Sequence, residues 1–185
     1  MSWINEIGGL LEQYSGASAA QAPDTVDNDF DEIAQVAPHS AIADGLAEAF
    51  RSEQTPEFGQ MAAQMFGQSN GNQRANILNT LISTLGPTLI AQMLGRKAGG
   101  GGGSGLGGLL EGLMGGGQQQ ITPEQAEQIP PEAVQDLAAE AEKRDPSIID
   151  QFSDFYADHP TLIKTLGGAA LAIALAKMAQ RQSGS

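Results

Sequence analysis

The sequence predicts an all-α protein made of two similar small helical arms joined by a glycine-rich linker. Apolar residues recur at helical spacing in one segment after another, and no segment alternates as a strand does. Residues 95–117 include thirteen glycines, a composition that weakens helices and is typical of linkers. We therefore expect three parts: an N-terminal arm with an amphipathic first helix at 1–94, a linker with a short apolar segment at 95–117, and a C-terminal arm at 118–185.

The two arms resemble each other along their length. Residues 7–12 (IGGLLE) match residues 106–111 (LGGLLE). Residues 36–38, followed by Asp44, are echoed by residues 129–131, followed by Asp136, and residues 78–81 are echoed by 163–166. Such internal similarity favours a duplication. Coincidence among alanine-rich helices is the alternative.

The N-terminal arm is predicted to begin with a helix over 3–14, followed by an acidic loop over 15–29. Thr55 as N-cap, Pro56 in the first turn and Glu57 at the positive end are together typical of a helix start. Apolar spacing then places the remaining helices of this arm near 30–34, from Ser40 to Phe50, from Thr55 to Gly67, over 77–85 before Gly86-Pro87, and over 89–94.

Inside the glycine run, residues 106–114 have helical apolar spacing, and we expect this segment to be ordered only where it docks. Thr122 and Gln125 predict a capping box at the start of the C-terminal arm. Further helices are expected over 134–141, over 148–156 after an Asp145-Pro146 cap, and over 160–181. The last helix is apolar nearly all round, which predicts burial on every side.

Charge and composition limit the partners. The chain of 185 residues has a net charge of −13, which repels phosphate backbones and disfavours an anionic membrane surface. Hydrophobic residues make up 41% but aromatics only 5%, so the core is expected to be thin. The sequence thus argues against nucleic-acid binding, and membrane contact is not favoured.

The compartment is not determined by the sequence. There is no cysteine, and the first residues carry Glu6 and Glu12 instead of the early basic residues of a secretory signal. The longest apolar run, 165–176, is shorter than the roughly 20 residues of a membrane-spanning helix. A cytoplasmic location is therefore the default expectation.

No segment carries a convincing catalytic or ligand-binding motif. Residues 103–108 match GxGxxG, but no strand precedes them. The acidic residues from Asp27 begin like a calcium loop, yet Glu32 and Pro38 occupy the positions that need glycine and glutamate. His39 and His159 each lie beside a proline at a helix start and outside any metal-binding pattern. We expect no catalytic residues, cofactor or metal, and hence no enzyme.

A family resemblance depends on three short motifs of the first arm: Gly-Gly-Leu-Leu at 8–11, Phe-Gly-Gln at 58–60 and Leu-Gly-Pro at 85–87. In these the first arm resembles the YidB-like group of uncharacterised bacterial proteins. The resemblance covers the first arm alone. It implies a bacterial helical protein punctuated by glycines and implies no catalytic activity.

The function that these features favour is a non-catalytic structural protein that self-associates into a homo-oligomer or filament. The alternatives are a peripheral membrane or envelope-associated factor that uses its glycine-bearing amphipathic helices, and an enzyme of unrecognised type. The sequence suggests no small-molecule ligand. The residues predicted to mediate self-association are the apolar ones of the first helix, the linker segment and the last helix: Trp3, Ile7, Leu10, Leu11, Leu106, Leu109, Leu110, Leu113, Leu166, Leu171, Ile173 and Leu175.

Overall fold

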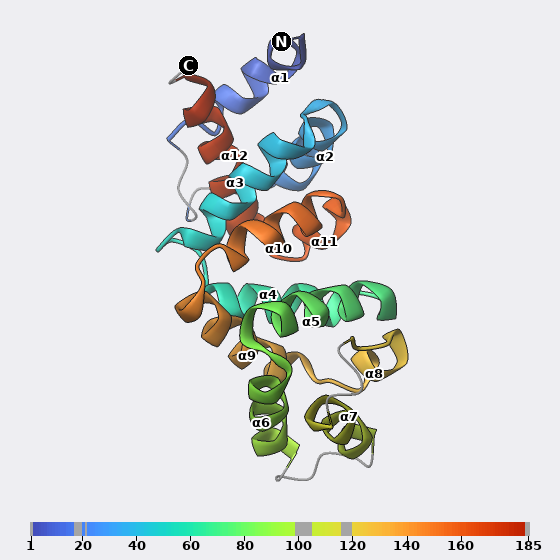
Figure 1. Ribbon diagram of the computed structural model, residues 1–185. Coiled ribbons are helices and arrows are strands. Elements are labelled where there is room, and N and C mark those ends of the chain that lie inside the picture. The colour runs from blue at the N-terminus through green and yellow to red at the C-terminus, as the bar shows by residue number, and fades with distance from the viewer. Residues whose placement is uncertain (1, 17–19, 21, 99–104, 116–119, 184–185) are drawn as a thin grey trace. The chain divides into compact units, whose positions relative to one another are not determined.

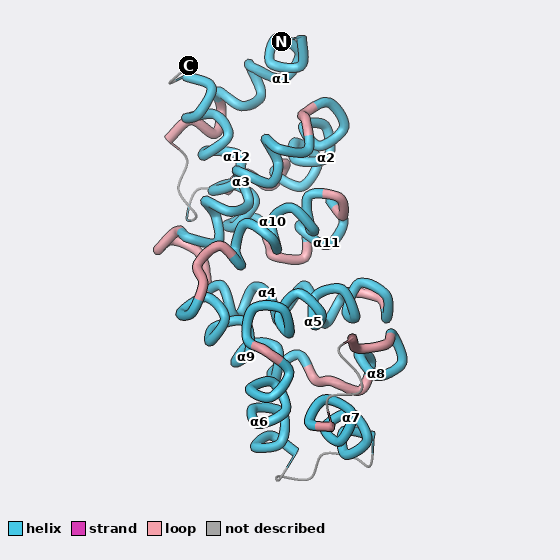
Figure 2. The backbone as a smooth tube through the Cα atoms, viewed as in Figure 1, coloured by secondary structure: helices cyan, strands magenta, loops and turns pink. Residues whose placement is uncertain are grey.

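The computed structural model describes residues 2–16, 20, 22–98, 105–115 and 120–183. Every regular element in these residues is a helix, which confirms the predicted all-α class (Figures 1 and 2). The helices follow the apolar spacing of the sequence, and their buried side chains are mainly Leu, Ile, Ala, Met and Phe.

The chain forms two compact units, but they are not the two sequential arms that the sequence suggested. Unit 1 consists of Met1–Glu57 and Ile149–Ser185, and unit 2 of Phe58–Ile148. Unit 1 therefore holds α1 (Ser2–Glu12), α2 (Val26–Val36), α3 (His39–Arg51), nearly all of α10 (Ile148–Ala157), α11 (Pro160–Lys164) and α12 (Gly168–Ser183). Unit 2 holds α4 (Phe58–Gln68), α5 (Gly71–Leu85), α6 (Pro87–Ala98), α7 (Gly105–Met114), α8 (Pro123–Glu127) and α9 (Pro131–Arg144).

Each unit combines the first half of one predicted arm with the second half of the other. The first arm contributes α1–α3 to unit 1 and α4–α6 to unit 2. The predicted linker contributes α7 to unit 2, and the second arm contributes α8 and α9 to unit 2 and α10–α12 to unit 1. The chain passes between units at corresponding places, after α3 and after α9. The prediction of separate arms failed because a glycine run marks a change in local composition, whereas long-range packing decides which apolar faces meet.

The helix contacts repeat between the units in the same order. If α1–α6 correspond to α7–α12, most helix contacts of unit 1 have a counterpart in unit 2. The exceptions among the described helices are α2–α12 in unit 1 and, in unit 2, the contacts of α4 with α5 and α9 and of α5 with α9. The matched pairs are α1–α2 with α7–α8, α1–α12 with α7–α6, α2–α11 with α8–α5, α3–α12 with α9–α6, and α11–α12 with α5–α6. This recurrence supports a duplication over chance similarity of the sequences.

The structure also changes which residues of the first arm correspond to the segment 163–167. Residues 82–86 (ISTLG), and not 78–81, are the counterpart of residues 163–167 (IKTLG), because both segments end in a glycine that separates two helices. Gly86 has φ +84° and Gly167 has φ +89°, in the region that favours glycine. The turn at Gly167 splits the predicted last helix over 160–181 into α11 and α12.

Several predicted helix ends are confirmed. Thr122 and Gln125 form the expected capping box, and Gly86 ends α5 before Pro87. The prediction that Thr55 is the N-cap of the next helix is wrong, because α4 begins only at Phe58. Its hydroxyl donates instead to the carbonyls of Ala49 and Ser52 at the end of α3.

Two predictions for acidic or glycine-rich loops also change. The expected loop over 15–29 ends early, since α2 starts at Val26 with Asp27 and Asp29 in its first turn, where acids favour the positive end of a helix. The segment that resembled the start of a calcium loop is thus helical. Part of the predicted linker is the helix α7, which packs against α6 and α8 of unit 2. The rest of the glycine run, at 99–104 and 116–117, lies outside the described residues.

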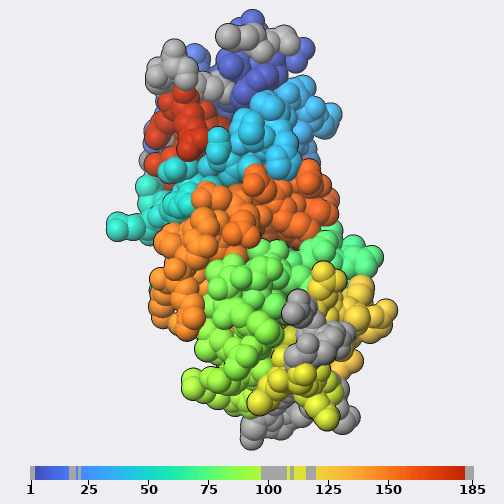
Figure 3. Space-filling model, in the orientation of Figure 1, coloured from blue at the N-terminus to red at the C-terminus, as the bar shows by residue number. Residues whose placement is uncertain are grey.

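The burial of α12 removes one argument for self-association. The sequence suggested that the last helix has more apolar surface than its own chain covers. In unit 1, α12 packs against α1, α2, α3 and α11 of the same chain, and Leu171, Ile173 and Leu175 are at most 2% exposed. Figure 3 shows this red segment directly beside the cyan segment that contains α3. One chain therefore suffices to cover it.

Candidate functional site

The residues predicted to mediate self-association fall into three groups. Ile7, Leu11, Leu113, Leu166 and the three apolar residues of α12 are buried within their own units, so they are not surface contacts. Trp3 and Leu10 of α1 are half-buried. The side chains of Leu106, Leu109 and Leu110 lie outside the described part of the chain, although the backbone of α7 is described.

Glycines on two of the short helices face open space. A methyl group added at Gly8 or Gly9 of α1, or at Gly108 of α7, would meet nothing within 4 Å. Gly9 and Gly108 occupy the same place in the repeated sequence GGLLE. By contrast, Gly45 of α3 and Gly59 of α4 touch neighbouring backbone closely. Gly8, Gly9 and Gly108 thus have no packing role within the described chain.

Unit 1 contains a pocket of about 290 Å³ at the junction of α1, α3 and α12. Its walls are mainly apolar, and a charged pair lies at its edge. Arg181 approaches Asp44 at 2.6 Å and Glu48 at 3.7 Å, with all three side chains at least one-third exposed. The lining residues are Trp3 and Ile4 from α1, Pro38, Ser40, Ala41 and Asp44 from the start of α3, and Met178 and Arg181 from α12.

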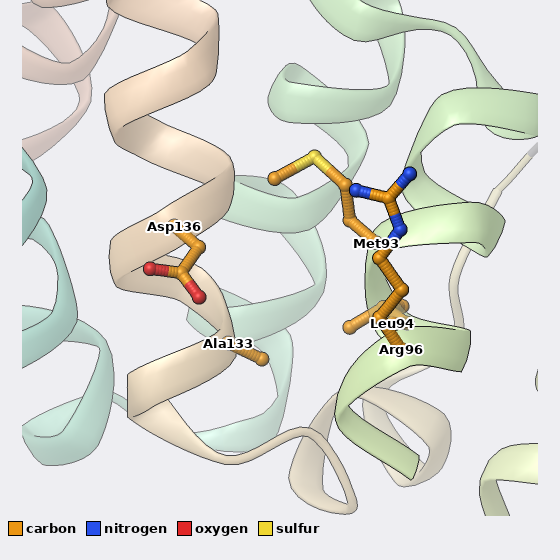
Figure 4. Close-up of a pocket in the computed structure, with 5 residues that line it drawn as sticks. All are labelled: Met93, Leu94, Arg96, Ala133 and Asp136. Atoms are coloured by element: carbon orange, nitrogen blue, oxygen red, sulfur yellow. The ribbon is translucent and has the colours of Figure 1, made fainter. Parts of the chain in front are cut away.

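Unit 2 contains a pocket of about 240 Å³ between α6 and α9. Figure 4 shows Met93 extending from α6 toward α9, while Ala133 and Asp136 extend from α9 toward α6. The complete lining is Met93, Leu94 and Arg96 from α6 with Ala133 and Asp136 from α9.

These two pockets occupy corresponding places in the two units. Pro38 and Pro130 are the N-caps of α3 and α9, with closely similar backbone angles, which fixes the alignment of these helices. The helix α12 is one turn longer than α6, and each carries a methionine three residues before an arginine. Two lining pairs are equivalent positions of the same residue type: Ala41 with Ala133, and Asp44 with Asp136. Met178 and Arg181 lie one turn further along α12 than Met93 and Arg96 lie along α6, because Gly86 and Gly167 align the starts of these two helices, so they are not equivalent positions.

Sequence analysis did not identify these pocket residues as a site. Asp44 and Asp136 were matched as part of the repeat, but no function was attached to them. The motif Met-x-x-Arg occurs at 93–96 and at 178–181, and it is the sequence signal for the other charged lining residue of each pocket. It passes unnoticed in the sequence because the arginine and the aspartate of one pocket come from different arms.

Few titratable groups in the described residues are unusual. Burial, reinforced by a hydrogen bond that the Tyr14 hydroxyl donates to Asp29, raises the pKa of Tyr14 well above its ordinary value. Hydrogen bonds from the side chain and backbone of Ser147 lower the pKa of Asp145. His39 lies near the carbonyl of Asp154 on α10 and near the carboxylate of Asp158, which follows the end of α10. No group of three or more metal-ligating side chains occurs within the described ranges.

Membrane-spanning segments were sought in the same residues. No single described helix is long and apolar enough to cross a membrane. One pair, Gly71–Leu85 with Pro87–Arg96, meets the length and composition criteria when taken together and is bent by 112°.

The fold and the paired pockets define an all-helical protein with two similarly built units. No protein-family model matches the chain, and comparisons with curated proteins and with solved structures find no similar protein. The YidB-like resemblance therefore stays a prediction.

Proposed function

We propose that the protein is a non-catalytic structural protein that self-associates, and that α1 and α7 supply the contact faces. The observation that carries this proposal is the open space around Gly8, Gly9 and Gly108. A glycine in a helix interior costs about 1 kcal/mol relative to alanine. Among the described residues no contact offsets that cost, whereas a helix from a second copy would pack closely against a stretch of helix without side chains.

The neighbouring side chains suit such a contact. Trp3 and Leu10 of α1 are only half-buried, and Met114 at the end of α7 is 69% exposed. Tryptophan is enriched at the energetic hot spots of protein interfaces, and methionine is enriched in interfaces generally. On α1, Trp3 and Leu10 share one side of the helix, Gly9 lies about a quarter turn from Leu10, and Gly8 lies on the opposite side. The buried residues of α12 have no part in this proposal.

Both closed and open assemblies fit these faces. Contacts between α1 of one copy and α1 of another would be isologous and close into a dimer. Contacts between α1 and α7 would be heterologous, and they extend into a filament unless the rotation closes a ring.

A membrane surface is the competing occupant of the α1 face. Interfacial helices usually carry lysine or arginine on the polar side, whereas Glu6 and Glu12 are the exposed charges of α1. The net charge of −13 adds repulsion from anionic lipid. Flotation with neutral and anionic vesicles separates the two cases: co-migration of the protein with vesicles would favour the membrane.

Sedimentation velocity over a concentration series tests self-association, with the double variant Gly8→Ala/Gly9→Ala as the probe. We expect the native chain to form larger species as concentration rises. The variant should have a higher melting temperature, because its helix is stronger, and yet should associate less. Gly95→Ala on α6 is the matched control, since it also faces open space; it should stabilise the chain without changing association. A native chain that stays monomeric at high micromolar concentration contradicts the proposal.

A further inference from the structure

The two units differ strongly in charge. Unit 1 contains fourteen aspartates and glutamates against four lysines and arginines, whereas unit 2 contains eight against five. The formal charges of the units are therefore −10 and −3, which together give the −13 of the chain. Two copies of the chain repel each other most where unit 1 meets unit 1, because like charges brought close together disfavour association. Charge therefore disfavours a contact between α1 of one copy and α1 of another.

The helices that carry the two proposed contact faces have opposite charge. The charged residues of α1 are Glu6 and Glu12, and both are exposed. The helix α7 carries Glu111, while α6, which packs against α7, carries Arg96 and Lys97. The pair formed by α6 and α7 is thus net positive, whereas α1 is net negative. Opposite charges on facing patches steer association and fix its orientation, so α1 of one copy is attracted to α6 and α7 of another.

Met114, the last residue of α7, has the most exposed large apolar side chain in the described part of the chain. It is 69% exposed, whereas the adjacent Leu113 is 4% exposed. Leu113 therefore holds the end of α7 on unit 2, and Met114 extends into solvent. A methionine side chain is unbranched and polarisable, so it fills irregular apolar spaces well.

The pocket of unit 1 has the size and the lining for such a side chain. Its volume of about 290 Å³ lies just below the roughly 300 Å³ at which small-molecule sites begin, so it suits a protein side chain better than a cofactor. Trp3, Ile4 and Met178 supply an apolar wall. A methionine sulfur beside an aromatic ring is a favourable contact, and Trp3 offers that ring. The ion pair of Arg181 with Asp44 at the edge is half-exposed, so its charges also reach an approaching chain.

We propose that Met114 of one copy fills the unit 1 pocket of a second copy, so that the chain assembles head to tail. This inference rests on the self-association proposed above and names its two contacting parts. The contact is heterologous: each copy offers one Met114 and one pocket. A pair of copies therefore keeps an unfilled pocket on one chain and an unused Met114 on the other, and each binds a further copy.

Two variants of the full chain, each changed on one side of the contact, test this inference by sedimentation velocity. Ala41→Leu adds bulk inside the pocket, and Met114→Gln replaces the apolar side chain by a polar one of similar length. Each variant alone should stay monomeric at concentrations where the native chain associates. An equimolar mixture of the two should form a dimer and nothing larger, because Met114 of the first variant still fits the open pocket of the second.

Conservative and displaced substitutions are the matched controls. Met114→Leu keeps a large apolar side chain and should associate as the native chain does. Gln151→Leu places a leucine on the exposed side of α10, outside the pocket, and should also leave association unchanged. Circular dichroism checks that each variant is folded. Since Met114 is on the surface, Met114→Gln tests the contact even where Ala41→Leu disturbs unit 1.

The outcomes separate this inference from the proposed function. A native chain that stays monomeric contradicts both. If the native chain associates, loss of association in Ala41→Leu alone means that unit 1 contacts unit 1, and loss in Met114→Gln alone means that α7 contacts α7. Either result overturns the head-to-tail contact while self-association stands. So does a mixture of two monomeric variants that forms no dimer, or association that neither substitution changes.

Discussion

Arg181 of α12 forms an ion pair with Asp44 of α3, with 2.6 Å between Nη1 and Oδ2. The two residues belong to opposite ends of the chain and to different halves of the repeat. Asp136, the counterpart of Asp44, lines the pocket of unit 2 together with Arg96, which lies one turn earlier on α6 than Arg181 lies on α12. In both units an aspartate and an arginine from different halves of the repeat therefore line the same pocket.

The energetic coupling between Arg181 and Asp44 should be small. Both side chains are about half exposed, and exposed ion pairs typically contribute 0.2–1 kcal/mol. A double-mutant cycle with Arg181→Met and Asp44→Asn, followed by urea unfolding, should give a coupling below about 1 kcal/mol that shrinks as salt is added. A larger coupling that does not respond to salt would show that the pair is a structural element, and would weaken the case for a binding role.

Gly45 is where α3 and α12 approach most closely. A methyl group at this position would lie 2.6 Å from Met178 Cγ and 2.9 Å from the Ala174 carbonyl oxygen. Because the second of these is backbone, it has little freedom to move. We expect Gly45→Ala to destabilise unit 1 by about 1–3 kcal/mol, the usual cost of overpacking, measured by urea unfolding.

The control for Gly45→Ala is Gly8→Ala on α1, where the added methyl group meets nothing. It should stabilise the folded chain by up to about 1 kcal/mol through helix propensity. Equal effects of the two substitutions would mean that α3 and α12 are not packed as described.

Asn79 of α5 holds the segment that precedes α8. Its Oδ1 accepts from the Ile121 backbone N–H at 2.7 Å, and its Nδ2 donates to the Ile121 carbonyl at 3.3 Å. Ile121 is 3% exposed, so its backbone groups have little access to water. Asn79→Ala should cost about 1–3 kcal/mol and accelerate hydrogen exchange at the Ile121 amide. Ser83→Ala, which removes a bond within the same helix, should have a much smaller effect; exchange at Ile121 that is equal in both variants contradicts the assignment.

The raised pKa of Tyr14 predicts that the folded chain loses stability in alkaline solution. Its folded-state pKa is raised by burial and by Asp29, so the unfolded chain releases this proton first, near pH 10. The stability contributed by the neutral phenol is complete below that pH and is lost as the pH rises toward the folded-state value. The urea midpoint of the native chain should therefore fall between about pH 9 and pH 11 more steeply than that of Tyr14→Phe. Parallel curves for the two proteins would contradict this explanation.

Local signals explain which features were predictable. The capping box of Thr122 and Gln125 and the helix end at Gly86 depend on residues within a few positions of each other, and both were found from the sequence. Thr55 carried a similar signal but failed, because carbonyls at the end of α3 took its hydroxyl instead. The split at Gly167 was missed because the apolar pattern continues through it, and only the positive φ reveals the turn.

The pockets could be predicted only in part. The repeat placed Asp44 opposite Asp136 in the alignment, whereas the Met-x-x-Arg motifs were not noticed. Neither showed that Arg181 would meet Asp44, because each arm read alone suggests that its own halves pack together.

The sequence by itself determined that this chain is helical, where most helices lie, that its arms resemble each other, and that it is strongly acidic. These properties follow from spacing, caps and composition, which act over one or two helical turns. Tertiary structure alone decided that the arms exchange halves, that α12 is covered by its own chain, and that an arginine and an aspartate from different arms share one pocket. The reason is physical: burial of apolar surface is not directional, so the pattern states that a helix has an apolar face but does not state which partner covers it.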